Sequence, residues 1–148
     1  MSFGLGHSMV KTYGLTHIAL AVRDPQRSLE FYRVALGVVC VWRSDDFIQA
    51  QTPGSRDVLV FERDRKKAGK SGGVAHFGFR LTKPSDIDAA VKAVRDAGGT
   101  VTDQGEFVPG EPYLFARDPD GYEFEIWYEI PTKVDPRPAR PKSRRARA

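Results

Sequence analysis

The chain has 148 residues, 41% of them hydrophobic, which is enough for one domain with a sizeable core and too few for two. The net charge of +4 comes from the C-terminus, because seven Lys/Arg and one Asp occur from Lys133 onward and leave the first 132 residues at −2. The body of the protein is therefore not basic, which argues against a nucleic-acid partner.

Two terminal segments lie outside the predicted domain. Residues 1–12 form an N-terminal extension without the basic region and apolar core of a targeting segment, and no apolar stretch approaches the ~18 residues of a membrane helix. We expect a cytoplasmic protein with no membrane partner. Residues 131–148, rich in Pro, Arg and Ala, are predicted to be a disordered basic tail; contact of this tail with nucleic acid or a membrane surface is the less favoured alternative.

The first half of the domain reads as a strand, a helix and three strands. Apolar and small residues alternate over 14–22, which indicates a half-buried strand, and Asp24 and Pro25 are suited to begin a helix that ends at Gly37. Short strands are predicted over 38–43, 47–52 and 57–63. The single cysteine, Cys40, lies in an apolar run, where we expect a buried side chain without a catalytic role.

The second half repeats this order after a polar linker over residues 64–73. A strand is predicted over 74–81, a helix over 84–97, and strands over 100–107, 113–117 and 122–128. His17 and His76 are 59 residues apart, as are Pro25 and Pro84. We therefore predict an α+β fold of two tandem βαβββ modules, residues 13–63 and 74–130, which form a cupped mixed sheet within a single domain, 13–130.

Strand alternation places both histidines on the open face of this sheet. Ile18, Leu20 and Val22 are the bulky set facing the helix, which leaves His17 on the other face; the same parity leaves His76 opposite Phe77 and Phe79. On the last strand Glu123, Glu125 and Trp127 share the open face. A single histidine on a strand is more often a packed residue than a ligand, but two at equivalent positions, with a carboxylate, are typical of a divalent-metal site with open positions.

The sequence resembles the vicinal oxygen chelate superfamily, which includes glyoxalase I, extradiol dioxygenases, fosfomycin-resistance thiol transferases and metal-free bleomycin-resistance proteins. The resemblance rests on HIALAV (17–22), HFGFRL (76–81) and DPDGYEFEI (118–126). It implies the glyoxalase/bleomycin resistance/dihydroxybiphenyl dioxygenase-like fold and assigns His17, His76 and Glu125 as ligands of one divalent metal ion. Fe, Zn, Ni, Co and Mn all suit two nitrogens and a carboxylate.

Two departures from the family pattern narrow the range of reactions that we expect. Glyoxalase I has a fourth ligand, a glutamate, where this chain has Val60, and Glu62 lies one pleat further on the same face. The extradiol signature has a tyrosine where Phe115 stands. We therefore expect a metal-dependent lyase, isomerase or dioxygenase of this superfamily, with the reaction subclass and the role of Glu62 left open.

The remaining expectations concern the substrate and the partner. The metal acts as a Lewis acid on two neighbouring oxygens of a small molecule. Glu123 is a candidate base, Arg80 a candidate anion-binding residue, and Trp127 and Tyr113 candidate walls of the substrate pocket, each with a purely structural alternative. The resemblance implies a homodimer, and in one arrangement found in the family His17 of one chain would join His76 and Glu125 of the other; a site within one chain is the alternative. The alternative function is a metal-free protein that sequesters a small molecule or antibiotic, as bleomycin-resistance proteins do.

Overall fold

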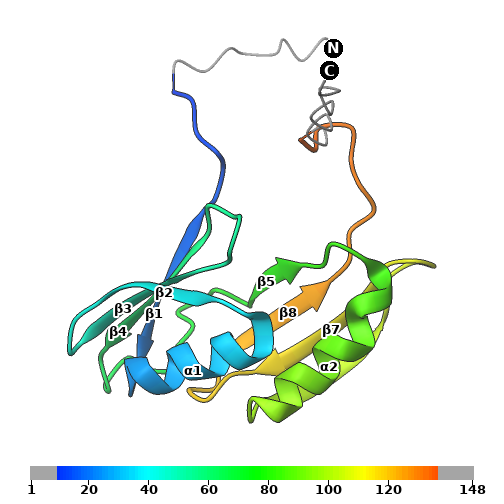
Figure 1. The fold of residues 1–148 in the computed structure, drawn as a ribbon. Helices are drawn as coiled ribbons and strands as arrows, with labels where there is room; N and C mark the ends of the chain where they lie inside the picture. Colours follow the sequence, from blue (N-terminus) through cyan, green and yellow to red (C-terminus); the bar gives the residue numbers. More distant parts are fainter. Residues whose placement is uncertain (1–9, 137–148) are drawn as a thin grey trace, which may run out of the picture.

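The computed structural model describes residues 10–136 (Figure 1). The predicted extension over 1–12 and the predicted basic tail over 131–148 therefore fall mostly outside the described residues. Within 10–136, neither helix is long and apolar enough to cross a membrane.

The structure confirms the α+β fold and the duplicated βαβββ order. The first module contains β1 (His17–Val22), α1 (Pro25–Leu36), β2 (Val39–Arg43), β3 (Phe47–Gln51) and β4 (Val58–Arg63). The second contains β5 (Phe77–Arg80), a 3₁₀ turn (Pro84–Asp86), α2 (Ile87–Asp96), β6 (Thr100–Glu106), β7 (Pro112–Arg117) and β8 (Glu123–Trp127). Observed boundaries lie within about three residues of the predicted ones; β1, β5 and α2 each begin three residues later than predicted, so β5 begins just after His76.

Each module builds its own four-stranded sheet. The strand orders are β1-β4-β3-β2 and β5-β8-β7-β6, with β1 parallel to β4 and β5 parallel to β8. The first and last strands of each module are therefore neighbours, and β1 and β5 lie at sheet edges. The two helices lie against each other along one side of the molecule (Figure 1).

The residues that flank helix α1 cap both of its ends. The Asp24 side chain accepts hydrogen bonds from the backbone amides of Gln26 and Arg27, at 3.0 and 3.4 Å, and so satisfies donors that a helix start leaves free. Gly37 adopts φ 71°, the left-handed conformation that ends a helix and that glycine reaches without strain.

Aromatic residues of α1 join the two modules in one core. Tyr32 stacks on Phe61 of its own module at a ring distance of 5.5 Å, while Phe31 meets Phe124 of β8 edge-on at 5.9 Å. Phe31, Tyr32, Phe61 and Phe124 are all at most 2% exposed. Because one helix packs on both modules, the orientation of the first module relative to the second is set by this core.

One expectation about burial is wrong. Cys40 is exposed, as is every residue of β2, because β2 is the outer strand of its sheet and α1 does not cover it. The apolar run around Cys40 therefore does not mark a buried strand; in the described chain it leaves Val39, Val41 and Trp42 about half exposed.

Candidate metal and substrate site

Two of the three predicted metal ligands meet in the second module. His76, immediately before β5, places its Nε2 3.2 Å from Oε2 of Glu125 on β8. The imidazole is 37% exposed, and its ring lies edge-on to Phe115 of β7 at 5.0 Å. The parallel pairing of β5 with β8 sets this approach, because it places Phe77 and Gly78, the two residues after His76, opposite Phe124 and Glu125.

Glu125 is buried although it lies on the open face of the sheet. Glu125 is 7% exposed. Within residues 10–136, its Oε1 atom is shielded from solvent and has no hydrogen-bond partner. Burial raises the pKa of this carboxyl, and His76 only partly opposes the rise. A buried carboxylate oxygen without a donor costs free energy unless a cation binds it, so the chemistry of this pair suits a metal ion.

His17 lies elsewhere in the same chain. It is exposed on the face of the first sheet, where it lines a cavity of about 360 Å³ together with Gln49, Val60 and Glu62. Across residues 10–136, no group of three or more His, Cys, Asp or Glu is close enough to hold a metal ion. One chain therefore carries two separate parts of the predicted site.

The strand registers identify equivalent positions in the two modules. Ala19, two residues after His17, is opposite Val60, and Gly78, two residues after His76, is opposite Glu125. Val60 thus occupies the position in the first module that Glu125 occupies in the second. Glu62 is opposite Ala21, one pleat further along. An alkyl side chain stands where a fourth carboxylate ligand would be expected.

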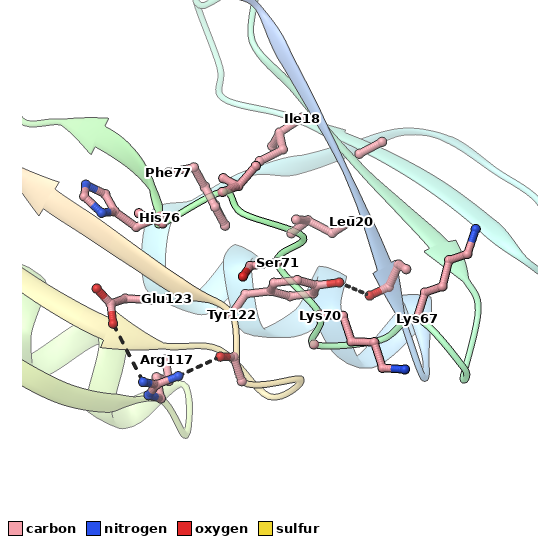
Figure 2. Close-up of a pocket in the computed structure, with 16 residues that line it drawn as sticks. Ile18, Leu20, Lys67, Lys70, Ser71, His76, Phe77, Arg117, Tyr122 and Glu123 are labelled. Atoms are coloured by element: carbon pink, nitrogen blue, oxygen red, sulfur yellow. Dashed lines mark hydrogen bonds and ion pairs between the residues drawn. The ribbon is translucent and has the colours of Figure 1, made fainter.

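Glu123, the candidate base, lies two residues before Glu125. Its Oε2 is 3.8 Å from Nη2 of Arg117, and the same guanidinium donates to the Gly121 carbonyl at 3.1 Å (Figure 2). The Glu123 side chain is 34% exposed, so it is accessible to a small molecule.

Aromatic side chains cover the face beside Glu125. Tyr113 and Trp127, predicted as pocket walls, face each other across β7 and β8 in register. Phe107, which the sequence reasoning did not single out, stacks on Tyr113 at 4.1 Å and meets Trp127 edge-on at 6.2 Å. Phe107 is 51% exposed, so this cluster presents an apolar surface to solvent.

Arg80 is engaged by its own chain. Its Nη2 donates to Asp135 at 2.7 Å, and its Nη1 lies 3.4 Å from Glu129. Thr132 also donates to Asp135 through its amide and hydroxyl groups, so residues 132–135 pass over Arg80. A substrate anion would have to displace Asp135 to use this guanidinium.

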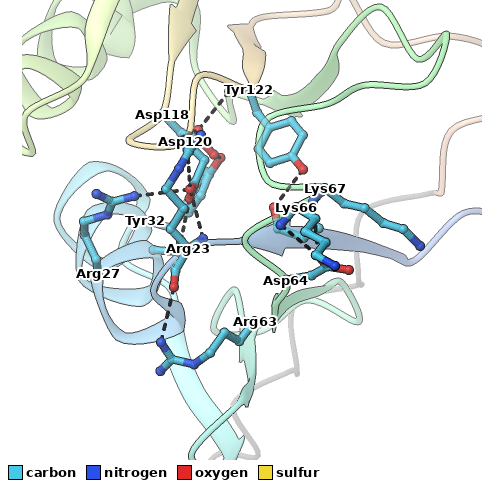
Figure 3. Close-up of polar contacts among 12 residues, drawn as sticks. Arg23, Arg27, Tyr32, Arg63, Asp64, Lys66, Lys67, Asp118, Asp120 and Tyr122 are labelled. Atoms are coloured by element: carbon cyan, nitrogen blue, oxygen red, sulfur yellow. Dashed lines mark hydrogen bonds and ion pairs between the residues drawn. The ribbon is translucent and has the colours of Figure 1, made fainter.

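A buried polar cluster fixes the strand that carries Glu123 and Glu125 (Figure 3). Asp120, in the turn before β8, has a side chain with no exposed surface; it accepts from the Arg23 amide at 3.0 Å and from the Arg27 guanidinium at 3.2 Å. The Tyr122 hydroxyl donates to the Ala21 carbonyl at 2.8 Å. The turn of the second module is therefore tied to β1 and α1 of the first.

The sequence reasoning treated this DPDG segment only as a turn and as part of a family motif. The sequence shows the groups that form this cluster, two aspartates and a tyrosine in the turn and Arg23 and Arg27 around the start of α1. Nothing in the sequence pairs these groups across the chain.

Comparison with known proteins identifies the family. The model of the Glyoxalase/Bleomycin resistance protein/Dioxygenase superfamily matches residues 14–126, most of the chain. The protein belongs to this superfamily. The matched region includes both modules, and its C-terminal limit falls just after Glu125.

Individual relatives in the superfamily are distant. The chain is 28% identical over 130 residues to a probable chloroplastic lactoylglutathione lyase of Arabidopsis thaliana, covering 80% of this chain and 36% of that protein. It is 27% identical over 116 residues to a manganese-dependent 2,3-dihydroxybiphenyl 1,2-dioxygenase of Geobacillus genomosp. 3, covering 77% and 36%. The chain thus spans about a third of the length of these curated relatives.

Among solved structures, a fosfomycin resistance protein FosX of Listeria monocytogenes superposes with a TM-score of 0.65 at 17% identity, covering 78% of this chain and 90% of that one. That protein was solved with Mn(II) and 1S,2S-dihydroxypropylphosphonic acid. At this identity the likeness establishes the superfamily fold.

Proposed function

We propose that the protein is a metal-dependent enzyme of the superfamily in which one divalent metal is held by His76 and Glu125 of one chain and His17 of a second copy. The observation that carries this proposal is the buried Glu125 Oε1, which has no donor in the described chain and lies on a carboxylate already beside an imidazole. A cation is the partner that this oxygen lacks.

A two-fold dimer supplies the missing histidine. Each chain exposes His17 on its first sheet and the His76 and Glu125 pair on its second, so two copies related by a two-fold axis form two identical sites. The small molecule then binds between the open faces of the two chains. This arrangement makes the homodimer a requirement for the site.

Val60 favours three protein ligands over four. Its alkyl side chain is 6% exposed and stands opposite Ala19, at the position equivalent to Glu125. Glu62 lies on the same face but opposite Ala21, one pleat away. Three ligands leave positions open for two substrate oxygens, and Fe, Zn, Ni, Co and Mn all suit the set. The manganese named in the dioxygenase and FosX relatives supports a divalent metal.

The groups around the metal ligands have separable roles. The bound metal supplies Lewis-acid stabilisation of the negative charge that develops on substrate oxygens. Glu123, partly exposed and two residues from Glu125, is positioned to accept a proton from the substrate. Tyr113 and Trp127 contact the apolar part of the substrate, and Arg80 binds an anionic group once Asp135 is displaced.

A second function has one observation in its favour. The aromatic cluster of Phe107, Tyr113 and Trp127 is exposed in a chain that gathers only two of the three ligands. The same surface would serve a metal-free protein that sequesters an aromatic ligand. The superfamily's name includes bleomycin resistance proteins.

Metal analysis of purified protein tests the proposal. After growth with Mn, Fe, Zn, Ni and Co and purification without chelator, we expect one metal ion per chain by elemental mass spectrometry. His17→Ala, His76→Ala and Glu125→Gln each lose the metal. Gln49→Ala, which alters the same cavity as His17 without removing a ligand, keeps it. An empty site in folded wild-type protein would instead support the metal-free binder.

A further inference from the structure

A second cavity lies between the two modules, apart from the aromatic cluster beside Glu125. It has a volume of about 470 Å³ and is bounded by β1, by the chain entering β5 and β8, and by the linker of residues 64–73 (Figure 2). A volume of this order is typical of small-molecule sites. One end of the cavity adjoins the proposed metal site, because His76 and Glu123 line it, but the opposite end is formed by the linker.

The walls of the cavity combine an apolar surface with basic groups. Its apolar lining comes from both modules: Ile18, Leu20, Val74 and Phe77. Its basic side chains are Lys67, Lys70, His76 and Arg117, and Glu123 is the one carboxylate among the described lining residues. That carboxylate lies 3.8 Å from Arg117, which leaves both lysines without an acidic neighbour at the cavity.

Both lysine ammonium groups lack a partner in the described chain. Among residues 10–136, neither Nζ forms a salt bridge or a side-chain hydrogen bond, whereas Lys92 on α2 binds Asp96. Figure 2 shows Lys67 and Lys70 on the linker at the side of the cavity away from His76, with their ammonium groups pointing in different directions. Two unpaired cations beside an apolar wall create a positive potential that favours an anionic ligand.

The linker holds these lysines in a defined position. Asp64 accepts hydrogen bonds from the amides of Lys66 and Lys67, each at 3.1 Å, and Ala68 is 6% exposed. Gly69 adopts φ 77°, and a Cβ there would overlap the carbonyl oxygen of Asp120. The linker is therefore packed against the DPDG turn, and the two lysines project from an anchored turn.

We propose that this cavity binds an organic anion with an apolar body, its carboxylate or phosphate group at Lys67 and Lys70 and its apolar part against Leu20, Val74 and Phe77. The flexible side chains of Lys67 and Lys70 can both turn toward one head group and donate charge-assisted hydrogen bonds to it, and the apolar wall favours a ligand with an apolar body over a small inorganic anion. The head group lies at the end of the cavity away from His76, and Lys67 and Lys70 are not metal ligands, so this binding requires neither the metal nor a second chain.

Nuclear magnetic resonance titration of the full chain tests this site, with methyl groups of Ile18, Leu20 and Val74 as reporters. The probe is octanoate; 1-octanol has the same body without the charge, and acetate has the charge without the body. We expect octanoate to shift the reporter methyls and to leave those of Val39 and Val41, on the distant β2, unchanged. Octanol and acetate should bind at least about tenfold more weakly, since each lacks one part of the interaction.

Matched variants test whether Lys67 and Lys70 bind the anionic head group. Lys67→Gln/Lys70→Gln should weaken octanoate binding by about tenfold or more, and Lys67→Arg/Lys70→Arg should retain it. Arg65→Gln/Lys66→Gln, next to Lys67 but outside the cavity lining, removes the same two positive charges and is the control for net charge. The titration is repeated with EDTA and in His17→Ala, where loss of metal with unchanged octanoate binding separates the two proposals. Equal binding of octanol, or full affinity in the Lys67→Gln/Lys70→Gln variant, would overturn the site.

Discussion

The hydroxyl of Tyr32 donates a 2.7 Å hydrogen bond to the carboxylate of Asp118, and this bond joins the first module to the second. Tyr32 lies on α1, and Asp118 begins the turn that leads into β8; both are buried. The other carboxylate oxygen of Asp118 accepts hydrogen bonds from the backbone amides of Asp120 and Tyr122. Because β8 carries Glu123 and Glu125, the contact also sets where these carboxylates lie relative to the first module.

Removing the hydroxyl tests this link. Tyr32→Phe keeps the ring in the core and leaves a buried carboxylate with one donor fewer, so we expect a loss of about 2 kcal/mol in the free energy of unfolding at pH ~7. Urea unfolding followed by circular dichroism measures it. The control is Tyr13→Phe, where the residue is 77% exposed, and a change there as large as in Tyr32→Phe would contradict the assignment.

The same pair predicts a dependence on alkaline pH. Burial raises the pKa of the Tyr32 hydroxyl well above its ordinary value of 10.0, and the charge of Asp118 acts in the same direction. The unfolded chain loses this proton at a lower pH than the folded chain, so the stability gained from the shift is complete below pH ~10 and is lost above it. The stability difference between wild type and Tyr32→Phe should narrow as the pH rises from ~9 to ~11. A constant difference over this range would argue against a buried, hydrogen-bonded tyrosine.

Asp120 should contribute more to the free energy of unfolding than an exposed aspartate that forms a similar ion pair. Asp120→Ala leaves Arg23 and Arg27 without their buried acceptor, and we expect a loss of about 3 kcal/mol in unfolding free energy. Asp46 pairs with Arg63 at 2.9 Å, but its side chain is 76% exposed, so Asp46→Ala should cost less than about 1 kcal/mol. Thermal unfolding of both variants gives the comparison, and equal costs would show that the cluster does not hold the modules together.

Much of this fold could be predicted because its signals are local. Asp24, Pro25 and Gly37 mark the ends of α1 through their own backbone and side-chain chemistry, and strand alternation separates His17 from Leu20 without tertiary information. Cys40 was misjudged because its burial depends on whether a helix covers β2, which no local pattern reveals.

The site was less predictable because it depends on contacts between distant segments. The pairing of His76 with Glu125 follows from the parallel register of β5 and β8, which the duplication indicated. The contact of Asp135 with Arg80 joins residues 55 positions apart, and that of Asp120 with Arg23 joins residues 97 positions apart. Sequence periodicity could reveal neither contact, nor the burial of Glu125.

Glu125 should reduce the stability of the metal-free protein. Burial raises the pKa of its carboxyl in the folded protein above the value in the unfolded chain. The carboxyl therefore has its full stabilising effect below pH ~4.5, where it is protonated in both states, and loses this effect as the pH rises through the raised pKa. With EDTA at pH ~7, Glu125→Gln should therefore be at least as stable as wild type, with a gain of up to about 1 kcal/mol, although it no longer binds metal. Glu123→Gln, on a more exposed carboxylate, is the control. A large loss of stability in metal-free Glu125→Gln would mean that the carboxylate has a structural partner instead.

Val60 offers a gain-of-ligand experiment. Val60→Glu places a carboxylate at the position equivalent to Glu125 and should tighten metal binding in the dimer by about tenfold, while the metal-free form loses about 2 kcal/mol because the position is buried. Val60→Gln changes the size without adding the charge and should gain much less affinity. Unchanged affinity in Val60→Glu would place this position away from the metal.

Mixing two inactive chains tests the central proposal most directly. Neither His17→Ala nor Glu125→Gln can hold the metal alone, but a dimer of one of each contains His17 from one chain opposite His76 and Glu125 from the other. After the two variants are unfolded together and refolded, we predict that metal content returns to about one quarter of wild type, because about half of the dimers are mixed and each has one intact site. No metal in the mixed dimers, isolated through two different affinity tags, would contradict a site shared between chains.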